Sequence, residues 1–169
     1  SVERIYVHES IHDAFVAAFV AEVKGFRMGD PMDEATYIGA ITRRPHLDVL
    51  KRQVADARKK GAELLLGGSV FRGKGNWFAP TVFADVKPSM KIAREEIFGP
   101  VVGVFKWNDE ATMLAQVNAV EYGLTASIWT NDLVTAHRTA AEVEAGFVWI
   151  NDVSKHFLGA PFGGFKQSG

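Results

Sequence analysis

Short apolar runs alternate with segments of helical periodicity along most of the chain. Residues 4–8 form a strand-like run, and the stretches 11–25 and 44–60 follow the pattern of amphipathic helices. Their apolar positions are Phe15, Phe19, Val20 and Val23 in the first stretch and Leu47, Leu50, Val54 and Ala57 in the second. A recurrence every three or four residues places these side chains on one face of a helix. We therefore predict a strand at 4–8 and two helices that each bury one face.

The second half of the chain repeats this alternation more regularly. Predicted strands lie at 101–107, 124–129 and 146–150, and predicted helices at 109–120 and 133–145. A β–α–β–α–β order with nearly continuous apolar strands is typical of a parallel sheet between layers of helices. The predicted fold class is therefore α/β, with a parallel sheet that carries helices on both faces.

The middle and the end of the chain are less regular. We expect a short strand at 63–66, a polar, Gly-rich, hairpin-like excursion at 69–76 with a turn at 73–75, and extended chain at 77–83 apart from Pro80. The Gly-rich tail at 152–169 has no clear periodicity. Irregular segments of this composition often carry function, and we interpret the tail as a functional loop.

Charge and composition exclude several classes of protein. The net charge is −1, which provides no positive field for nucleic acid or for an acidic membrane. No apolar run approaches the roughly 20 residues that span a bilayer. The chain contains no cysteine and shows no apolar signal segment at its start, so we expect a cytoplasmic protein. The missing thiols also exclude disulfides, cysteine-ligated metals and cysteine nucleophiles within these residues.

One metal motif occurs by letter and is rejected on geometry. The sequence H-E-x-x-H at 8–12 matches the zinc-protease pattern, which needs both histidines on one helix. Ser10 is the best N-cap of the region, with Asp13 three residues later. The helix should then begin between His8 and His12, so their side chains should diverge. We predict no metal site.

Two further motifs also fail. The tail sequence G-A-P-F-G-G-F-K lacks the spacing of a phosphate-binding loop, and no G-x-S-x-G segment presents a serine for attack. We therefore predict no catalytic nucleophile in this chain.

The most informative segment is R-E-E-I-F-G-P-V at 94–101. A charged pair, an aromatic residue and a Gly-Pro turn immediately before a buried strand are unusual together. The segment resembles the E-E-I-F-G-P signature of the aldehyde dehydrogenase superfamily, which depends on NAD or NADP. Further matching segments follow in the family's order: R-I-Y-V at 4–7, G-D-P at 29–31, P-T-V at 80–82, Y-G-L at 122–124, G-F-V-W-I-N at 146–151 and P-F-G-G-F-K-Q-S-G at 161–169. The resemblance covers essentially the whole chain and implies the C-terminal part of the family's catalytic domain.

The resemblance implies four site residues. Glu96 matches the glutamate that binds the nicotinamide ribose, and a carboxylate can accept hydrogen bonds from both hydroxyls of a vicinal diol. Phe98 matches the aromatic residue beside the nicotinamide. Phe162 matches a residue that lines the aldehyde pocket, and His156 stands at a position that often shapes substrate choice. We expect Trp149 to belong to the strand core.

The family's chemistry requires a cysteine thiolate that forms a thiohemiacetal and then a thioester, and this chain has none. The resemblance places that cysteine just before Ser1 and the cofactor-binding domain further upstream. We therefore expect a truncated catalytic domain, inactive alone, from an enzyme that oxidises an aldehyde to a carboxylic acid. The full-length protein is expected to be a homodimer or homotetramer.

A second interpretation remains open at this stage. The chain could be a non-catalytic α/β module that binds a ligand or a partner. The sequence does not identify the aldehyde, and it does not distinguish NAD from NADP.

Overall fold

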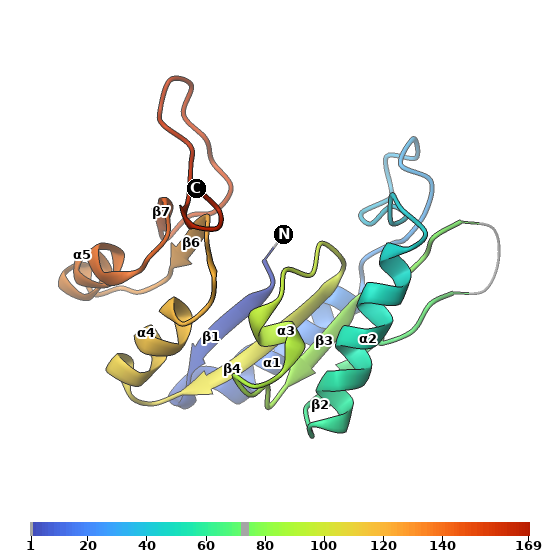
Figure 1. Cartoon of the computed structure of the whole chain (residues 1–169), viewed down its shortest axis with the longest axis horizontal. Coiled ribbons are helices and arrows are strands. Elements are labelled where there is room, and N and C mark those ends of the chain that lie inside the picture. The colour runs from blue at the N-terminus through green and yellow to red at the C-terminus, as the bar shows by residue number, and fades with distance from the viewer. Residues whose placement is uncertain (1, 72–74) are drawn as a thin grey trace. The chain divides into compact units, whose positions relative to one another are not determined.

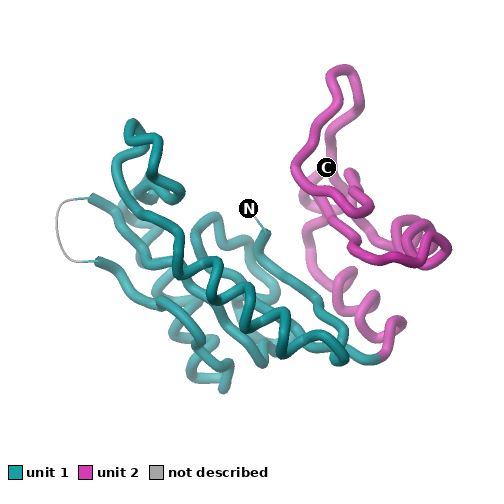
Figure 2. Tube along the Cα trace, turned by 180° about the vertical axis from the view of Figure 1, so that it is seen from behind, with its two compact units in different colours: residues 1–108 teal, residues 109–169 magenta. Residues whose placement is uncertain are grey.

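The computed structural model describes residues 2–71 and 75–169. The chain divides into two compact units, Ser1–Asn108 and Asp109–Gly169 (Figure 2).

The first unit is built on a four-stranded sheet with the order β1-β4-β3-β2. The strands are β1 (Arg4–His8), β2 (Glu63–Leu66), β3 (Thr81–Ala84) and β4 (Val101–Trp107). β4 pairs in parallel with both β1 and β3; a parallel sheet was predicted, but not these partners. β2 instead pairs antiparallel with β3, because the chain returns directly from one strand to the other rather than through a crossover helix.

Helices cover both faces of this sheet (Figure 1). α1 (Glu9–Lys24) packs on one face, where its apolar side chains meet a cluster that contains Val82, Val102 and Val104. α2 (His46–Lys59) and α3 (Lys91–Arg94) pack on the other face, against Phe83, Val101 and Phe105. Successive strand residues point to opposite faces, so each inner strand contributes to two cores. The predicted α/β fold class, with helices on both faces of a sheet, is confirmed.

The start of α1 corrects one prediction. Ser10 is not the N-cap; the helix begins at Glu9, and His8 caps it. The His8 imidazole Nδ1 accepts a hydrogen bond from the Ser10 backbone N–H at 3.3 Å. The histidine side chain thus caps the helix in the way that a serine hydroxyl commonly does. The helix therefore begins between the two histidines, as predicted. His12 lies on the helix, buried, with its Nδ1 2.8 Å from Asp13. Among the described residues, no group of three or more potential ligands could hold a metal ion.

The excursion between β2 and β3 has antiparallel arms. Val70 and Phe78 form an antiparallel bridge, and the Ala79 N–H donates to the Ser69 carbonyl at 2.9 Å. Residues 72–74, which include most of the predicted turn at 73–75, lie outside the described residues. Regular strand in the predicted extended run is limited to β3.

The second unit contains a β–α–β unit and a short tail pairing. Its elements are α4 (Glu110–Asn118), β5 (Tyr122–Gly123), β6 (Thr125–Ile128), α5 (Leu133–Glu142), β7 (Phe147–Ile150) and β8 (Phe165–Lys166). β6 and β7 pair in parallel in a sheet of their own, so the predicted strands of the second half do not share one sheet with β4. Periodicity identifies a strand but does not identify its partner. β5 and β8 pair antiparallel and fix the end of the tail.

In neither described range is there a helix with both the length and the apolar character needed to cross a membrane.

Candidate functional site

The segment 95–98, called the signature loop here, follows α3 and is joined to β4 by Gly99 and Pro100. Ile97 is its anchor, fully buried in the core beneath α2. The next residue, Phe98, has φ of 47° and leaves 66% of its surface exposed. A left-handed conformation at a residue other than glycine costs about 1–3 kcal/mol and persists only where the surroundings hold it. The loop is therefore fixed from below and presents an aromatic ring outward.

The two adjacent carboxylates of the loop have different environments. Glu95 accepts hydrogen bonds from the Lys91 ammonium at 2.7 Å and from the Gln53 amide at 3.2 Å. The Lys91 hydrogen bond is the main reason that the pKa of Glu95 lies below its ordinary value, and partial burial opposes it. Glu96 is exposed, and within the described residues its carboxylate has no hydrogen bond or ion pair. Of the pair, Glu96 is the carboxylate that is free to bind a ligand.

The environment of Glu95 predicts an acid-sensitive contribution to stability. A carboxyl whose pKa is lowered by folding stabilises the folded state above its unfolded pKa, here 4.5, and loses that contribution as the pH falls through the lowered value. Glu95→Gln should therefore reduce the free energy of unfolding at about pH 7 and have little effect at about pH 3. Urea unfolding at both values, repeated in a Lys91→Met background, measures this. A pH-independent difference, or one that survives in that background, would contradict the assignment.

Close packing explains the Gly-Pro turn after the loop. A Cβ atom on Gly99 would lie 2.7 Å from Cδ2 of Leu50, which is fully buried in α2. The Pro100 carbonyl accepts a hydrogen bond from the Thr81 N–H at 2.7 Å, which ties the turn to β3. Glycine at this position leaves the buried Leu50 side chain undisturbed, whereas a larger residue would require it to shift.

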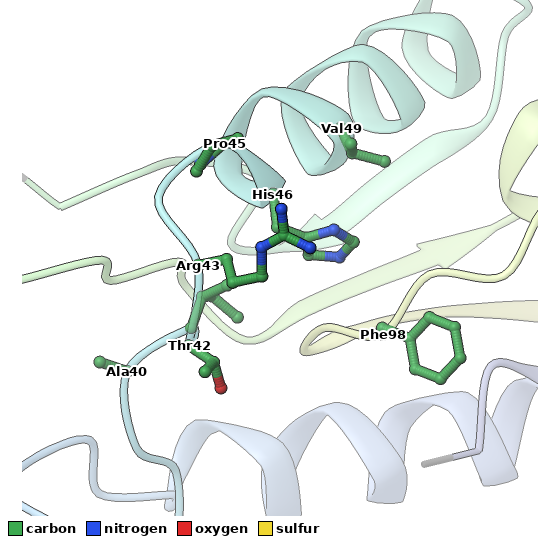
Figure 3. A pocket seen from close by; sticks show the side chains of 8 residues that line it. Ala40, Thr42, Arg43, Pro45, His46, Val49 and Phe98 are labelled. Carbon is green, nitrogen blue, oxygen red and sulfur yellow. The ribbon is translucent and has the colours of Figure 1, made fainter.

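A pocket of about 510 Å³ opens beside Phe98. It is lined by Ala40, Ile41, Thr42, Arg43, Pro45, His46, Val49 and Phe98. Figure 3 shows the side chains of Arg43 and His46 across the pocket from the Phe98 ring. The His46 Nε2 lies 2.7 Å from the Ile97 carbonyl oxygen, which can only accept, so His46 donates to the signature loop. The pocket therefore combines an aromatic wall, a guanidinium and a histidine that supports the loop.

The second unit holds an aromatic cluster, defined as Phe147, Trp149, His156 and Phe162. The His156 and Phe162 rings meet edge to face with centroids 4.9 Å apart, and Phe147 lies 5.7 Å from each of them. Trp149 is buried, as predicted, and its indole N–H donates to the Lys155 carbonyl at 2.8 Å. Contacts of this geometry are favourable for aromatic rings. Two residues of the irregular tail, His156 and Phe162, thus pack against the aromatic side chains of β7.

The predicted site residues therefore occur as two pairs. Glu96 and Phe98 lie on the signature loop of the first unit, and His156 and Phe162 contact each other in the second.

Four residues near the signature loop were not predicted from the sequence. They are Glu3, Arg43, His46 and Gln53. The sequence contains a signal for Gln53, because it is a polar residue on the otherwise apolar face of α2. Glu3 is 94 residues from Ile97 in sequence, and no local pattern could reveal its contact.

Comparison with known proteins assigns the family. Aldehyde dehydrogenase tropH of Talaromyces stipitatus is 49% identical, with all of this chain and 34% of that protein matched. Two solved structures cover 98% of this chain and 34% of their own: an NAD+ complex of aldehyde dehydrogenase from Bacillus cereus (TM-score 0.92, 35% identity) and an E. coli NADP-dependent enzyme (TM-score 0.94, 34% identity). The chain thus spans about a third of the length of these relatives. The model of the aldehyde dehydrogenase family matches residues 1–169, and this chain belongs to that family.

Proposed function

We propose that this chain is the C-terminal part of the catalytic domain of an enzyme that oxidises an aldehyde to a carboxylic acid with NAD+ or NADP+. The nicotinamide cofactor, when bound, would accept the hydride. The residues of this chain would bind and orient the nicotinamide side of the cofactor and form part of the aldehyde pocket. The cofactor-binding domain and the cysteine nucleophile would be supplied by other parts of the full-length protein, a homodimer or homotetramer.

The observation that carries this proposal is the contrast between Glu95 and Glu96. Glu95 is engaged by Lys91 and Gln53, whereas Glu96 is exposed and has free acceptor positions on a loop that is otherwise firmly held. A carboxylate with both oxygens free fits the two hydroxyls of a ribose.

The surroundings of Glu96 also fit a nicotinamide nucleotide. Phe98 offers an exposed flat ring on the same loop, beside a pocket large enough for part of such a ligand. Arg43 lines that pocket with a positive charge, which suits an anionic cofactor.

On the aldehyde side, Phe162 would provide an apolar wall of the pocket, and His156 would add a polar group to that wall. Such a wall would exclude water from the carbonyl group and orient it. The cytoplasmic location remains a prediction from the sequence.

Phe162→Ala tests the aldehyde wall. We expect the KM for the aldehyde to rise about fivefold in the full-length protein, since an aromatic contact contributes about 0.5–1.5 kcal/mol beyond its buried area. The KM for the cofactor should stay within about twofold. Phe157→Ala is the matched control, an exposed phenylalanine of the same tail that does not belong to the aromatic cluster. Equal effects of the two substitutions on the aldehyde KM would contradict the role of Phe162.

The direct test of the proposed function is an activity assay of the full-length protein. A panel of aliphatic, aromatic and cationic aldehydes is supplied with NAD+ or NADP+, and reduced cofactor and carboxylate product are both quantified. We expect equal amounts of the two products with at least one aldehyde. Absence of turnover across the panel, together with absence of cofactor binding, would reject the proposal in favour of a non-catalytic binding module.

A further inference from the structure

Three side chains from outside the signature loop hold its backbone. The Glu3 carboxylate oxygen Oε1 accepts hydrogen bonds from two successive N–H groups, those of Ile97 at 2.9 Å and Phe98 at 3.0 Å. His46 donates to the Ile97 carbonyl, and Gln53 donates to the Glu96 carbonyl at 3.1 Å. We call Glu3, His46 and Gln53 the loop clamp.

Glu3 is the member of the clamp that acts on the strained residue. Phe98 is in the left-handed region, and its N–H is one of the two groups that Glu3 binds. Successive N–H groups that converge on one anion are a recurrent anion-binding arrangement in proteins. Here the anion is a side chain of the protein itself, which leaves these N–H groups satisfied in the absence of any ligand.

Glu3 is itself fixed to the sheet. Its carbonyl accepts a hydrogen bond from the Gly103 N–H of β4 at 3.0 Å, immediately before the start of β1. Glu3 therefore connects the loop to the β1–β4 strand pair. His46 and Gln53 connect the same loop to α2, so the sheet and a helix hold it from two sides.

We propose that Glu3 is a positioning residue for the nicotinamide side of the cofactor. Its contact with two consecutive N–H groups holds Phe98 in the left-handed conformation and thereby fixes the direction of the Phe98 ring and of the preceding Glu96 carboxylate. The role rests on the function proposed above. Without the Glu3 carboxylate, Phe98 is free to relax to an ordinary backbone conformation, which turns the ring and moves Glu96.

The test compares Glu3→Ala with Glu3→Gln in the full-length protein. Glutamine retains an acceptor oxygen of nearly the same shape, whereas alanine removes it. We expect Glu3→Ala to raise the KM for the nicotinamide cofactor about tenfold, the order expected when a hydrogen bond to a charged group is lost. The KM for the aldehyde should change less than about twofold, and Glu3→Gln should recover most of the loss. Glu63→Ala, which removes an exposed carboxylate of β2, is the matched control and should leave both values unchanged.

A second measurement separates the clamp from the proposed function. Hydrogen–deuterium exchange without cofactor should be faster in Glu3→Ala than in the unsubstituted protein for peptides that contain the Ile97 and Phe98 amides. Unchanged exchange there would overturn the clamp itself. Faster exchange in a protein without nicotinamide-dependent turnover would overturn the proposed function and the cofactor role of Glu3, while the clamp contact would stand.

Two results of the kinetic comparison would overturn the proposal. Equal increases in both KM values would show a merely structural role and overturn the proposal. So would the same loss in Glu3→Gln as in Glu3→Ala, since the acceptor oxygen would then not matter. If Glu3→Ala does not fold, Glu3→Ser takes its place. A cofactor KM about tenfold higher in Glu3→Ser, with most of that loss recovered in Glu3→Gln, supports the proposal, and equal cofactor KM values in the two variants overturn it.

Discussion

Replacement of Glu96 by alanine should weaken the binding of the nicotinamide cofactor to the full-length protein by a factor of about 10 to 100. A hydrogen bond to a charged group contributes about 1.5–3 kcal/mol, and each 1.4 kcal/mol is tenfold in affinity. The Glu96 carboxylate is exposed and is engaged by no described side chain, so its removal disturbs no internal contact. Thermal stability should therefore change little.

Cofactor titration by fluorescence or calorimetry measures this effect. Glu63→Ala serves as control, because it removes an exposed carboxylate from the same unit at a distance from the loop in sequence. Glu96→Gln should retain part of the affinity, since one amide oxygen can still accept a hydrogen bond from the ribose. Unchanged affinity in Glu96→Ala would remove the cofactor role from this residue.

The second large effect concerns the 169 residues by themselves. We expect no aldehyde-dependent reduction of NAD+ or NADP+ by this chain alone, because it contains no cysteine to form the covalent intermediate that the proposed reaction requires. Loss of an essential nucleophile removes the covalent route altogether and does not merely slow it.

The measurement is turnover by the purified chain, with the full-length protein assayed in parallel. Circular dichroism should first establish that the tested chain retains its mixed helix and strand content. Turnover that co-purifies with the chain and is abolished by Glu96→Ala would show that another group in these residues performs the chemistry.

Periodicity predicted the helices and strands that are buried on one face or on both faces. β4 is apolar over most of its length and lies at the centre of the sheet, and the predicted range 101–107 is the observed one. The helices were also predicted, with ends that differ by a few residues because caps depend on local side-chain contacts, as His8 shows. Strand partners were not predicted correctly: β2 runs antiparallel, and β6 and β7 form a separate pair. Pairing depends on contacts between distant segments, which no local pattern reports.

The candidate site was predicted only in part, for the same reason. The resemblance to a known family led to Glu96 and Phe98, and the structure shows why the loop presents them outward: Ile97 is the buried residue between them. The supports of the loop could not be predicted. Gln53 and His46 reach it from α2, and Glu3 reaches it from the beginning of the chain, so these contacts exist only once the sheet and helix are assembled.

The signature loop is proposed to bind the nicotinamide ribose through Glu96. The most direct measurement is a crystal structure of the full-length protein with a bound nicotinamide cofactor. We expect the Glu96 carboxylate within hydrogen-bond distance of the two ribose hydroxyls and the Phe98 ring beside the nicotinamide, with Glu3 still bound to the N–H groups of Ile97 and Phe98. A cofactor whose ribose is held by other residues, with Glu96 directed into solvent, would contradict it.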